Sequence, residues 1–395
     1  MTDPRAVEER HGSGAVQRRR ATIVRAEGAH LFDADGTRYV DLAAAHGWAA
    51  LGHGHPAVTR ALAEQAGRVV MLTESAANDV RARWLEALVT LLAREFLTDD
   101  RGALSRVAPA NSGAEAIEAA LKFARYRTGR TDVLAFARGF HGRTLGALSA
   151  TAPSPRREVF APLVPGFSHV PYGDLAAAER AVDDRTAAVV VEVIQGEGGV
   201  HEGSTEFLKG LEALGRERGA LLVVDEIQTG LGRTGRWFAS GWHGLAPDVV
   251  VLGKALGGGI PMGAAIWRAR LGGFEPGLHG STFAGAPLAC AASLATLAVL
   301  EAEQLPDRAQ YLGDRVLDVC RAFAAPIVRS VRGRGLMIGI ELKSRVTPVL
   351  DTLMGKGVWA LPAGGNVLRF LPPLTIPEDD LWAALAIVRD VLADA

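Results

Sequence analysis

Residues 248–259 read Asp-Val-Val-Val-Leu-Gly-Lys-Ala-Leu-Gly-Gly-Gly, an apolar run that ends in one lysine followed by three glycines. The chain prefers arginine as its cation, because only five of its 43 Lys and Arg residues are lysine. A buried lysine amine can lose its proton and react with a carbonyl group, whereas a guanidinium cannot. We therefore interpret Lys254 as a reactive residue at the end of a core strand.

A second apolar run, Leu221-Leu-Val-Val-Asp225-Glu226, places an acid 29 residues before Lys254. A lysine and an aspartate at the ends of neighbouring core strands are the two groups that pyridoxal phosphate (PLP) requires. The lysine forms a Schiff base with the cofactor, and the aspartate keeps the pyridine nitrogen protonated. On these two segments alone, a pair of ordinary strand ends remains an open alternative.

The composition is that of an ordinary globular protein, with 48% hydrophobic and 22% charged residues. A chain of 395 residues is expected to form two domains, or one large domain with a smaller one. A net charge of −1 argues against nucleic acid as the main partner. Only Cys290 and Cys320 are present, so we expect no disulfide framework and a cytoplasmic location.

No segment predicts a membrane anchor. The first ten residues lack the apolar core of a signal peptide. Residues 284–300 carry no charge, but they are built mainly of Ala and Leu with some Ser and Thr, contain Pro287, and are shorter than the ~20 strongly apolar residues that a span needs. We expect a buried helix there, which can lie at a subunit interface. The run Arg18-Arg19-Arg20 is expected to be a solvated patch.

The first 60 residues are expected to form an N-terminal arm and the edge of a small domain. Within them, residues 30–41 predict a hairpin, because Asp35-Gly36 supplies a favoured turn. From residue 61 to 290, strands alternate with helical patterns, which predicts a large PLP-binding α/β domain. The expected strands are residues 106–110, 133–137, 167–170, 187–194, 221–225, 249–252 and 264–267.

Several of these strands are continuous apolar runs, as expected where helices cover both faces of a parallel sheet. The predicted fold class is therefore α/β, with a mostly parallel, doubly wound sheet. Ligands of such sheets bind beyond the carboxyl ends of the strands, where Asp225 and Lys254 both fall. Residues 291–395 predict a smaller C-terminal α+β domain, with helices at 307–324 and from 378, and strands at 327–331, 336–342, 358–360 and 367–370.

Three loops after strands carry candidate binding groups. Residues 111–115, Asn-Ser-Gly-Ala-Glu, open a helix whose free N–H groups suit a phosphate, provided that the Glu115 carboxylate points away. Residues 138–144 offer an aromatic ring for stacking and Arg143 for a carboxylate. Residues 191–199 offer a carboxylate that can hold an arginine until substrate arrives. A plain N-cap by Ser112, a surface turn and a polar loop remain open alternatives.

Taken together, these segments resemble the class III aminotransferases of the PLP-dependent type I fold, in the acetylornithine and ornithine aminotransferase group. The resemblance runs from about residue 22 to the C-terminus. Each matching segment alone is weak, but their order makes them specific as a set. They are residues 111–116, 140–144, 194–199, 225–235, 247–248, 253–259, 281–283, 287–289, 332–337 and 368–373.

The resemblance implies a complete cofactor site. Lys254 and Asp225 are the catalytic residues, Gln228 bonds the phenolic oxygen of the cofactor, and Phe140 stacks on its ring. The start of the helix binds the phosphate, together with Thr282 of a partner subunit, so a homodimer with shared active sites is implied. The cofactor-binding residues are then Ser112, Gly113, Ala114, Phe140, Asp225, Gln228, Lys254 and Thr282.

The resemblance also implies substrate contacts and no metal. Arg143 binds a substrate carboxylate, and Arg369 binds the α-carboxylate of glutamate with Glu197 as its gate. Ser281 lies at the substrate mouth. The chain departs from the usual family pattern at four positions, which leaves its fine substrate preference and its interface open: Ile117, Val193, Ala284 and Ala286.

The expected reaction is ping-pong transamination from a terminal amine to 2-oxoglutarate, giving a semialdehyde and glutamate. N-acetylornithine or a related ω-amino acid is the leading donor, in arginine or lysine biosynthesis. Residues 120–129 and 360–373 also resemble enzymes that act on lysine or ornithine attached to a small acidic carrier protein, which is the alternative. A PLP-dependent mutase or epimerase is the second alternative.

Overall fold

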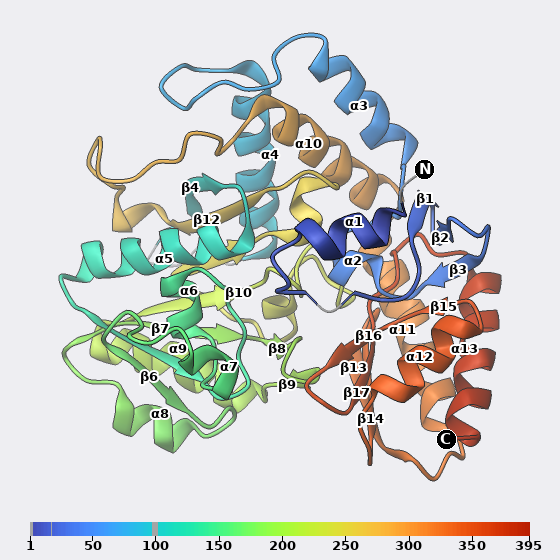
Figure 1. Ribbon diagram of the computed structural model, residues 1–395. Helices are drawn as coiled ribbons and strands as arrows, with labels where there is room; N and C mark the ends of the chain where they lie inside the picture. The colour runs from blue at the N-terminus through green and yellow to red at the C-terminus, as the bar shows by residue number, and fades with distance from the viewer. Residues whose placement is uncertain (1–2, 17, 97–101) are drawn as a thin grey trace.

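The computed structural model describes residues 3–16, 18–96 and 102–395 (Figure 1). Its largest sheet has seven strands in the order β4-β12-β11-β10-β7-β5-β6. All seven strands expected in the α/β region form, with ends shifted by no more than two residues. They are β4 (Leu104–Ala110), β5 (Asp132–Phe136), β6 (Phe167–Val170), β7 (Thr186–Glu192), β10 (Leu221–Asp225), β11 (Val249–Leu252) and β12 (Gly263–Arg268).

The sheet is mostly parallel, as predicted. Strands β6, β5, β7, β10 and β11 pair in parallel, and β12 runs antiparallel to both β11 and β4. Every residue of β7, β10 and β11 is buried. This burial explains the continuous apolar runs, because a strand covered on both faces has no solvent-facing positions for polar side chains.

Helices cover both faces of the sheet. Helix α5 (Gly113–Thr128) packs on one face, against alternate side chains such as Val190 and Val223. Helix α9 (Thr205–Arg218) packs on the other face, against Val189 and Val191. The remaining helices around this sheet are α3 (Pro56–Ala66), α4 (Asp79–Glu95), α6 (Leu145–Ala150), α7 (Pro155–Glu158), α8 (Leu175–Ala181) and α10 (Pro287–Ala302).

A second sheet, in the order β13-β14-β17-β16, is antiparallel throughout. Its strands are β13 (Val328–Arg334), β14 (Met337–Leu342), β16 (Leu361–Ala363) and β17 (Val367–Phe370), and nearby helices are α11 (Leu305–Arg321), α12 (Thr347–Gly355) and α13 (Glu378–Ala393). The sequence predicted this α+β region, but neither β16 nor α12. Strand β16 holds only three residues, too few for a visible alternation.

The two ends of the chain share a third sheet, and Figure 1 shows the blue and red segments side by side. It contains β1 (Ile23–Glu27), β2 (His30–Asp33), β3 (Arg38–Asp41) and the parallel strand β15 (Val358–Trp359). The predicted hairpin is β2–β3, with Gly36 at φ 83° in its turn. The division of the chain at residues 60 and 290 stays a prediction, and α10 runs through the second of these boundaries.

Short elements complete the chain. They are α1 (Pro4–His11), α2 (Ala44–Gly47), β8 (Ile194–Gln195), β9 (His201–Glu202), η1 (Ala239–Trp242), η2 (Lys254–Gly257) and η3 (Ala269–Leu271). Within the described ranges no single helix is long and apolar enough to cross a membrane; α10 and α11 meet that criterion only as a pair, bent by 62°.

Helix α10 is the buried helix expected from residues 284–300. Its Ser293 Oγ accepts a hydrogen bond of 2.9 Å from the indole N–H of Trp84 on α4. Both side chains are fully buried, with exposed fractions of 0%. The bond therefore joins the two helices at a place where water cannot replace a lost partner.

Ser293→Ala is expected to lower the free energy of unfolding by about 1–3 kcal/mol, because it leaves a buried indole donor without an acceptor. Urea denaturation measures the change. Ser168→Ala, at an exposed position of β6, is the matched control and should stay within about 0.5 kcal/mol. Combining Ser293→Ala with Trp84→Phe should cost less than the sum of the single changes. Strict additivity would contradict a coupling between the two groups.

Candidate active site

The predicted site residues meet at the carboxyl edge of the large sheet. Asp225 is the last residue of β10, and it pairs in register with Val251 of β11. Lys254 follows Val251 by three residues, so its backbone leaves the sheet beside Asp225. The loops after β5 and β7 and the start of α5 reach the same edge. This is where ligands of doubly wound sheets bind.

Lys254 has the properties of a reactive amine. It is half-buried, and its Nζ makes no hydrogen bond or ion pair with any described residue. Burial lowers the pKa of Lys254, and Arg369 lowers it further, although Glu197 and Asp225 act in the opposite direction. The backbone at Lys254 has φ 44°, a strained conformation for a side chain with a Cβ. A lowered pKa supplies the neutral amine that carbonyl chemistry needs.

Asp225 is held by a histidine to which the sequence analysis assigned no role. Its Oδ2 lies 2.7 Å from Nδ1 of His141, and its Oδ1 accepts a 3.0 Å bond from the N–H of Ile227. Both side chains are buried. Burial alone lowers the pKa of His141, but the bond and charge of Asp225 raise it above its ordinary value. The bond from His141 fixes the orientation of the Asp225 carboxyl group.

His141 was visible in the sequence only as the neighbour of Phe140 in a loop after a strand. Nothing in that pattern pairs it with an acid 84 residues later. The pairing arises because β5 and β10 both flank β7 in the sheet.

Glu192, the last residue of β7, lies beside Asp225 in the strand register. Its carboxylate accepts bonds from the N–H groups of Phe140 at 3.0 Å and Gly196 at 3.3 Å. Burial raises the pKa of Glu192 to about 7, and the charge of Asp225 adds to this effect while His141 opposes it. Glu192 therefore ties two site loops to the sheet edge.

The start of α5 touches both catalytic segments. A Cβ added at Gly113 would lie 2.8 Å from Ile227, just after Asp225, and one at Gly253 would lie 3.2 Å from the Cα of Gly113. The N–H groups of Gly113 and Ala114 begin the helix, so they have no acceptor within it. Helix starts of this kind bind anions.

The side chains around this helix start leave it open to an anion. Ser112 is the N-cap, with its Oγ accepting from the N–H of Glu115 at 3.1 Å. The Glu115 carboxylate is engaged by Asn111, at 3.0 Å from its N–H and 2.8 Å from its Nδ2. The Glu115 carboxylate therefore has hydrogen-bond partners of its own, and an N-cap by Ser112 does not exclude an anion at Gly113.

The predicted gate residues form one cluster. Glu197 Oε1 lies 2.8 Å from Nη1 of Arg369, and Gln228 bonds both, donating to Glu197 at 3.2 Å and accepting from Arg369 at 3.0 Å. Arg369 is fully buried, and its Nε and Nη2 have no partner among the described residues. These two nitrogens form one edge of the guanidinium, the arrangement that binds a carboxylate by two parallel bonds.

Glu197 is held ionised by its neighbours. Burial alone would raise the pKa of Glu197, but His46, Arg369 and Lys254 together bring it well below its ordinary range. His46 Nδ1 lies 3.9 Å from Glu197 Oε1, and its side chain is exposed. His46 could not be predicted from the sequence, because it follows three alanines in a stretch without any recognisable pattern.

The other predicted residues lie around this centre. Ser281 Oγ accepts a 2.9 Å bond from Asn111 Nδ2, which places residue 281 at the start of α5. Phe140 is half-buried, and the exposed Arg143 has its guanidinium carbon 5.9 Å from the centre of the Phe140 ring. Thr282 is exposed and bonds to no described residue of this chain. Its role toward a partner subunit stays a prediction.

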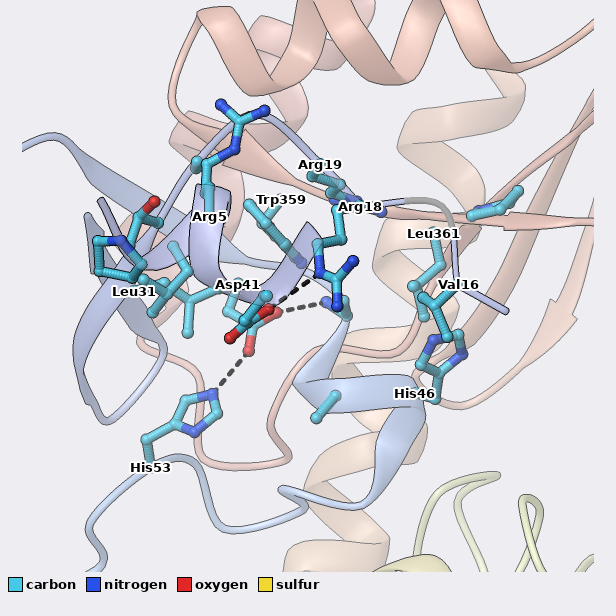
Figure 2. Close-up of a pocket in the computed structure, with 18 residues that line it drawn as sticks. Arg5, Val16, Arg18, Arg19, Leu31, Asp41, His46, His53, Trp359 and Leu361 are labelled. Carbon is cyan, nitrogen blue, oxygen red and sulfur yellow. Dashed lines mark hydrogen bonds and ion pairs between the residues drawn. The ribbon is translucent and has the colours of Figure 1, made fainter. Parts of the chain in front are cut away.

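One cavity near the site is lined by His46 and another by Glu197, and Lys254 lines neither. The first, the arm cavity, has a volume of about 640 Å³ and lies between residues 4–16 and 18–23 on one side and the segment around Trp359 on the other (Figure 2). Asp41, bonded to His53 at 2.8 Å, and His46 also line it. The second, the rim cavity, has a volume of about 490 Å³ and is lined by Phe140 and Glu197 among others.

The expectation that Arg18-Arg19-Arg20 is a solvated patch holds for the exposed Arg20 and was wrong for Arg18 and Arg19, which are partly buried. Arg19 donates to the carbonyl of Ala360 and lies 4.3 Å over the ring of Trp359. Burial lowers its pKa. Arg18 pairs with Glu8 at 2.9 Å. The arm carries few apolar side chains, so arginine stems and cation–π contact attach it to the fold instead.

The residues at the sheet edge fit pyridoxal phosphate. A partnerless lysine amine and a buried aspartate lie at the same edge, and an aromatic ring lies beside them. A helix start with small residues and free N–H groups completes the set. Among the described residues, no group of three or more His, Cys, Asp or Glu is arranged to hold a metal ion.

His141→Asn removes the ionisable partner of Asp225 but keeps a hydrogen-bond donor. Because the folded pKa of His141 is raised above 6.5, its contribution to stability is complete below about pH 6.5 and is lost as pH rises through the folded pKa. The excess free energy of unfolding of the native chain over His141→Asn should therefore be largest at low pH and shrink as pH rises.

Urea unfolding at about pH 5.5, 7 and 8.5 measures this difference. His11→Asn, at an exposed position of α1, is the control and should show a flat difference. A pH-independent difference for His141→Asn would contradict the proposed ionised pair.

Comparison with known proteins agrees with this geometry. The chain matches the family "Aminotransferase class-III" over residues 13–392. It is 44% identical to the acetylornithine aminotransferase of Methanopyrus kandleri, over 99% of both chains. It is 41% identical to the [LysW]-aminoadipate semialdehyde transaminase of Deinococcus radiodurans, over 98% of this chain and 89% of that one.

Among solved structures, the ornithine aminotransferase of Toxoplasma gondii superimposes with a TM-score of 0.93 at 34% identity, over 98% of this chain and 93% of that one. That structure contains PLP at its active site. With this fold, this sheet-edge site and these relatives, the chain belongs to the class III aminotransferases, which depend on pyridoxal phosphate.

Proposed function

We propose that this aminotransferase moves the terminal amino group of N-acetylornithine, or of a closely related ω-amino acid, to 2-oxoglutarate. The products are a semialdehyde and glutamate, in arginine or lysine biosynthesis. The observation that carries the proposal is the cluster of Glu197, Gln228 and Arg369, a carboxylate receptor with its own internal counter-ion. The identity to an acetylornithine aminotransferase supports the choice of donor.

Each half-reaction uses the same residues. When bound, PLP supplies an electron sink for the carbon that bears the amine. Lys254 takes a proton from that carbon and returns it, as base and then as acid, and its lowered pKa favours the neutral amine that acts as the base. Asp225, held by His141, provides the negative charge for the pyridine nitrogen. Gln228 would hold the phenolic oxygen of the bound cofactor.

Ser112, Gly113 and Ala114 are proposed to hold the phosphate, and Phe140 to cover one face of the ring. Their support is the helix start without side-chain bulk and the half-buried ring at the same edge. Thr282 is proposed to bind the phosphate of the partner subunit, and Ser281 to border the substrate mouth.

Two carboxylate receptors serve two substrates. Arg143, exposed beside Phe140, is proposed to bind the carboxylate of the amine donor. Arg369 is proposed to bind the α-carboxylate of glutamate after Glu197 moves away. While the donor is bound, Glu197 neutralises Arg369, because a buried charge without a partner is costly.

We also propose a homodimer in the cytoplasm. Large apolar side chains are exposed next to Thr282 and near α10, and surfaces of this kind commonly mark interfaces. They include Val70, whose carbonyl accepts from the N–H of Leu288, as well as Leu278 and Phe283. Both cysteines are free and buried, which accords with a reducing compartment.

A second candidate donor is lysine or ornithine attached to an acidic carrier protein. Its support is the 41% identity to the LysW-dependent transaminase and the exposed arginines Arg138 and Arg143 next to Phe140. Binding of an acidic protein would depend strongly on ionic strength, whereas binding of a small donor in a partly buried site would not.

The donor proposal is tested by incubating the PLP-loaded enzyme with a panel of amines, with and without 2-oxoglutarate. N-acetylornithine is expected to give glutamate with little salt dependence. Lys254→Ala should lower turnover by about 10²–10⁴-fold, because the proton carrier is removed. Product formation without 2-oxoglutarate would favour a mutase or epimerase, and activity only on a carrier-bound donor would favour the second candidate.

Glu197→Ala tests the gate. The change is expected to shift the preference between glutamate and N-acetylornithine toward glutamate by about tenfold or more, since it frees Arg369 and leaves it without a counter-ion in the donor complex. Single-turnover rates of the two half-reactions measure the preference. Glu217→Ala, at an exposed position of α9, is the matched control. An unchanged preference in Glu197→Ala would rule the gate out.

A further inference from the structure

Another cavity, the back pocket, lies at the amino edge of the large sheet, away from the active site. Its volume is about 350 Å³, and it is lined by the ends of α5 and α9 and by residues that precede β11 or follow β12. Leu221, the first residue of β10, lines the back pocket, whereas Asp225 ends the same strand at the catalytic edge. At ~3.3 Å per residue, the strand holds these two residues about 13 Å apart.

Four arginines from separate segments line the back pocket. They are Arg127, Arg130, Arg216 and Arg270. Asp248, the acid among the described lining residues, is buried, and its Oδ2 accepts a 3.0 Å bond from the N–H of Leu222. The whole chain has a net charge of −1, so the positive charge in this cavity is a local concentration. A concave surface with one sign of charge attracts ligands of the opposite sign.

Arg130 is held in place by the backbone of neighbouring segments. Its Nη1 donates to the carbonyl of Thr186 at 3.1 Å and to that of Arg218 at 2.6 Å. These bonds use both hydrogens of Nη1, and Nε and Nη2 have no partner among the described residues. Nε and Nη2 form a second edge of the guanidinium, which can bind two oxygens of one phosphate group by parallel bonds. An arginine that is fixed in this way loses little freedom when it binds an anion.

Gly219 leaves the free edge of Arg130 uncovered. It ends α9 with φ 70°, a conformation that by itself favours glycine. A Cβ added at residue 219 would also lie 3.3 Å from Nη2 of Arg130. Because Gly219 itself lines the back pocket, a larger side chain at this position would crowd the edge of the guanidinium that is free to bind.

The ends of two helices explain part of the positive charge. A helix C-terminus carries about half a negative charge, and Arg127 and Arg216 lie in the last turns of α5 and α9. Arg216 also pairs with Glu212 at 3.0 Å. These two arginines therefore stabilise the helices whether or not a ligand binds.

The helix ends do not account for all four arginines. Arg130 and Arg270 lie outside both helices. Arg127 and Arg270 are exposed, and neither has a hydrogen-bond or ion-pair partner among the described residues. Asp248 and the two helix ends together carry about two negative charges, which the four arginines exceed. The back pocket is therefore positive overall.

We propose that the back pocket binds a polyphosphate, a chain of two or more phosphate groups. The free edge of Arg130 holds one phosphate group, and Arg127 and Arg270 pair with the next. Such a chain carries several negative charges in a small volume, and planar guanidinium groups fit phosphate oxygens. The described lining residues include no aromatic ring, so the phosphates are recognised and not a stacked base. This site is independent of the proposed function, because it lies at the other edge of the sheet.

The test is calorimetric titration of the PLP-loaded enzyme with inorganic pyrophosphate, orthophosphate and ADP at low ionic strength. Loading with PLP occupies the proposed phosphate position at the start of α5. Pyrophosphate is expected to bind at least about tenfold more tightly than orthophosphate, because it reaches more than one arginine, and added salt should weaken its binding. ADP should bind about as tightly as pyrophosphate, since both carry the same chain.

Arginine variants locate the site. Arg270→Gln removes a charge that has no structural partner, so it should weaken pyrophosphate binding by about tenfold without affecting folding. Arg130→Gln should weaken binding at least as much, and Arg130→Lys should retain only part of it, because an ammonium group cannot bind two oxygens in parallel. Arg389→Gln, an exposed arginine on α13, is the matched control and should keep the native affinity.

Thermal unfolding gives a second readout. A ligand that binds only the folded chain raises the Tm, so pyrophosphate should raise the Tm of the native enzyme and of Arg389→Gln more than that of Arg270→Gln. The absorbance of the bound cofactor should stay the same, which shows that pyrophosphate does not displace PLP.

Each outcome bears on the inference. Equal affinity for pyrophosphate and orthophosphate, or native affinity for pyrophosphate in both Arg130→Gln and Arg270→Gln, would mean an adventitious ion only and would overturn it. Loss of binding in Arg143→Gln in place of Arg270→Gln would assign the anion to the active site and overturn it as well. Tighter binding of ADP than of pyrophosphate, with the same dependence on Arg270, supports the pocket and makes a nucleotide the source of the chain.

Discussion

The parallel pairing of β10 with β11 is the constraint on which the site depends. In this register Asp225 lies opposite Val251. Lys254 follows Val251 by three residues, so it lies beside the end of β10. Every residue of both strands is buried, and a shift of one residue would turn each apolar side chain to the opposite face. Core packing on α5 and α9 thus fixes the relative position of an acid and an amine that lie 29 residues apart.

Charges at this edge are arranged in pairs that leave defined atoms free. Asp225 is matched by His141, and Glu197 by Arg369 and Gln228. The atoms at this edge without partners among the described residues include the amine of Lys254 and one edge of the Arg369 guanidinium. These are a nucleophile and a carboxylate receptor, the two groups that an aminotransferase must present to its substrate. The paired charges stabilise the site, and the unpaired atoms are the ones free to react with or bind a substrate.

The sequence predicts a structural feature well when that feature depends on the residue types of one short segment. The seven core strands were predicted because both of their faces are buried, and Lys254 and Asp225 because each ends such a strand. The role of His141 could not be predicted in this way, because its partner, Asp225, lies on a strand two positions away in the sheet. The prediction also failed for Arg19, because a run of arginines looks the same whether water or Trp359 surrounds it. The family resemblance pointed to Glu197 and Arg369, but only the structure shows the free edge of Arg369.

Several residues with strained backbone conformations lie around Glu197, the proposed gate. Residues with a Cβ and positive φ include His46, which faces Glu197, and Val200, which closes the loop that carries it. Arg138, packed against that loop, and Lys254 are two more. Each such residue costs on the order of 1–3 kcal/mol, and the cost is borne only where the surroundings hold it in place. The proposed gate requires the loop that carries Glu197 to take a second position, and strain stored in the first position lowers the cost of leaving it.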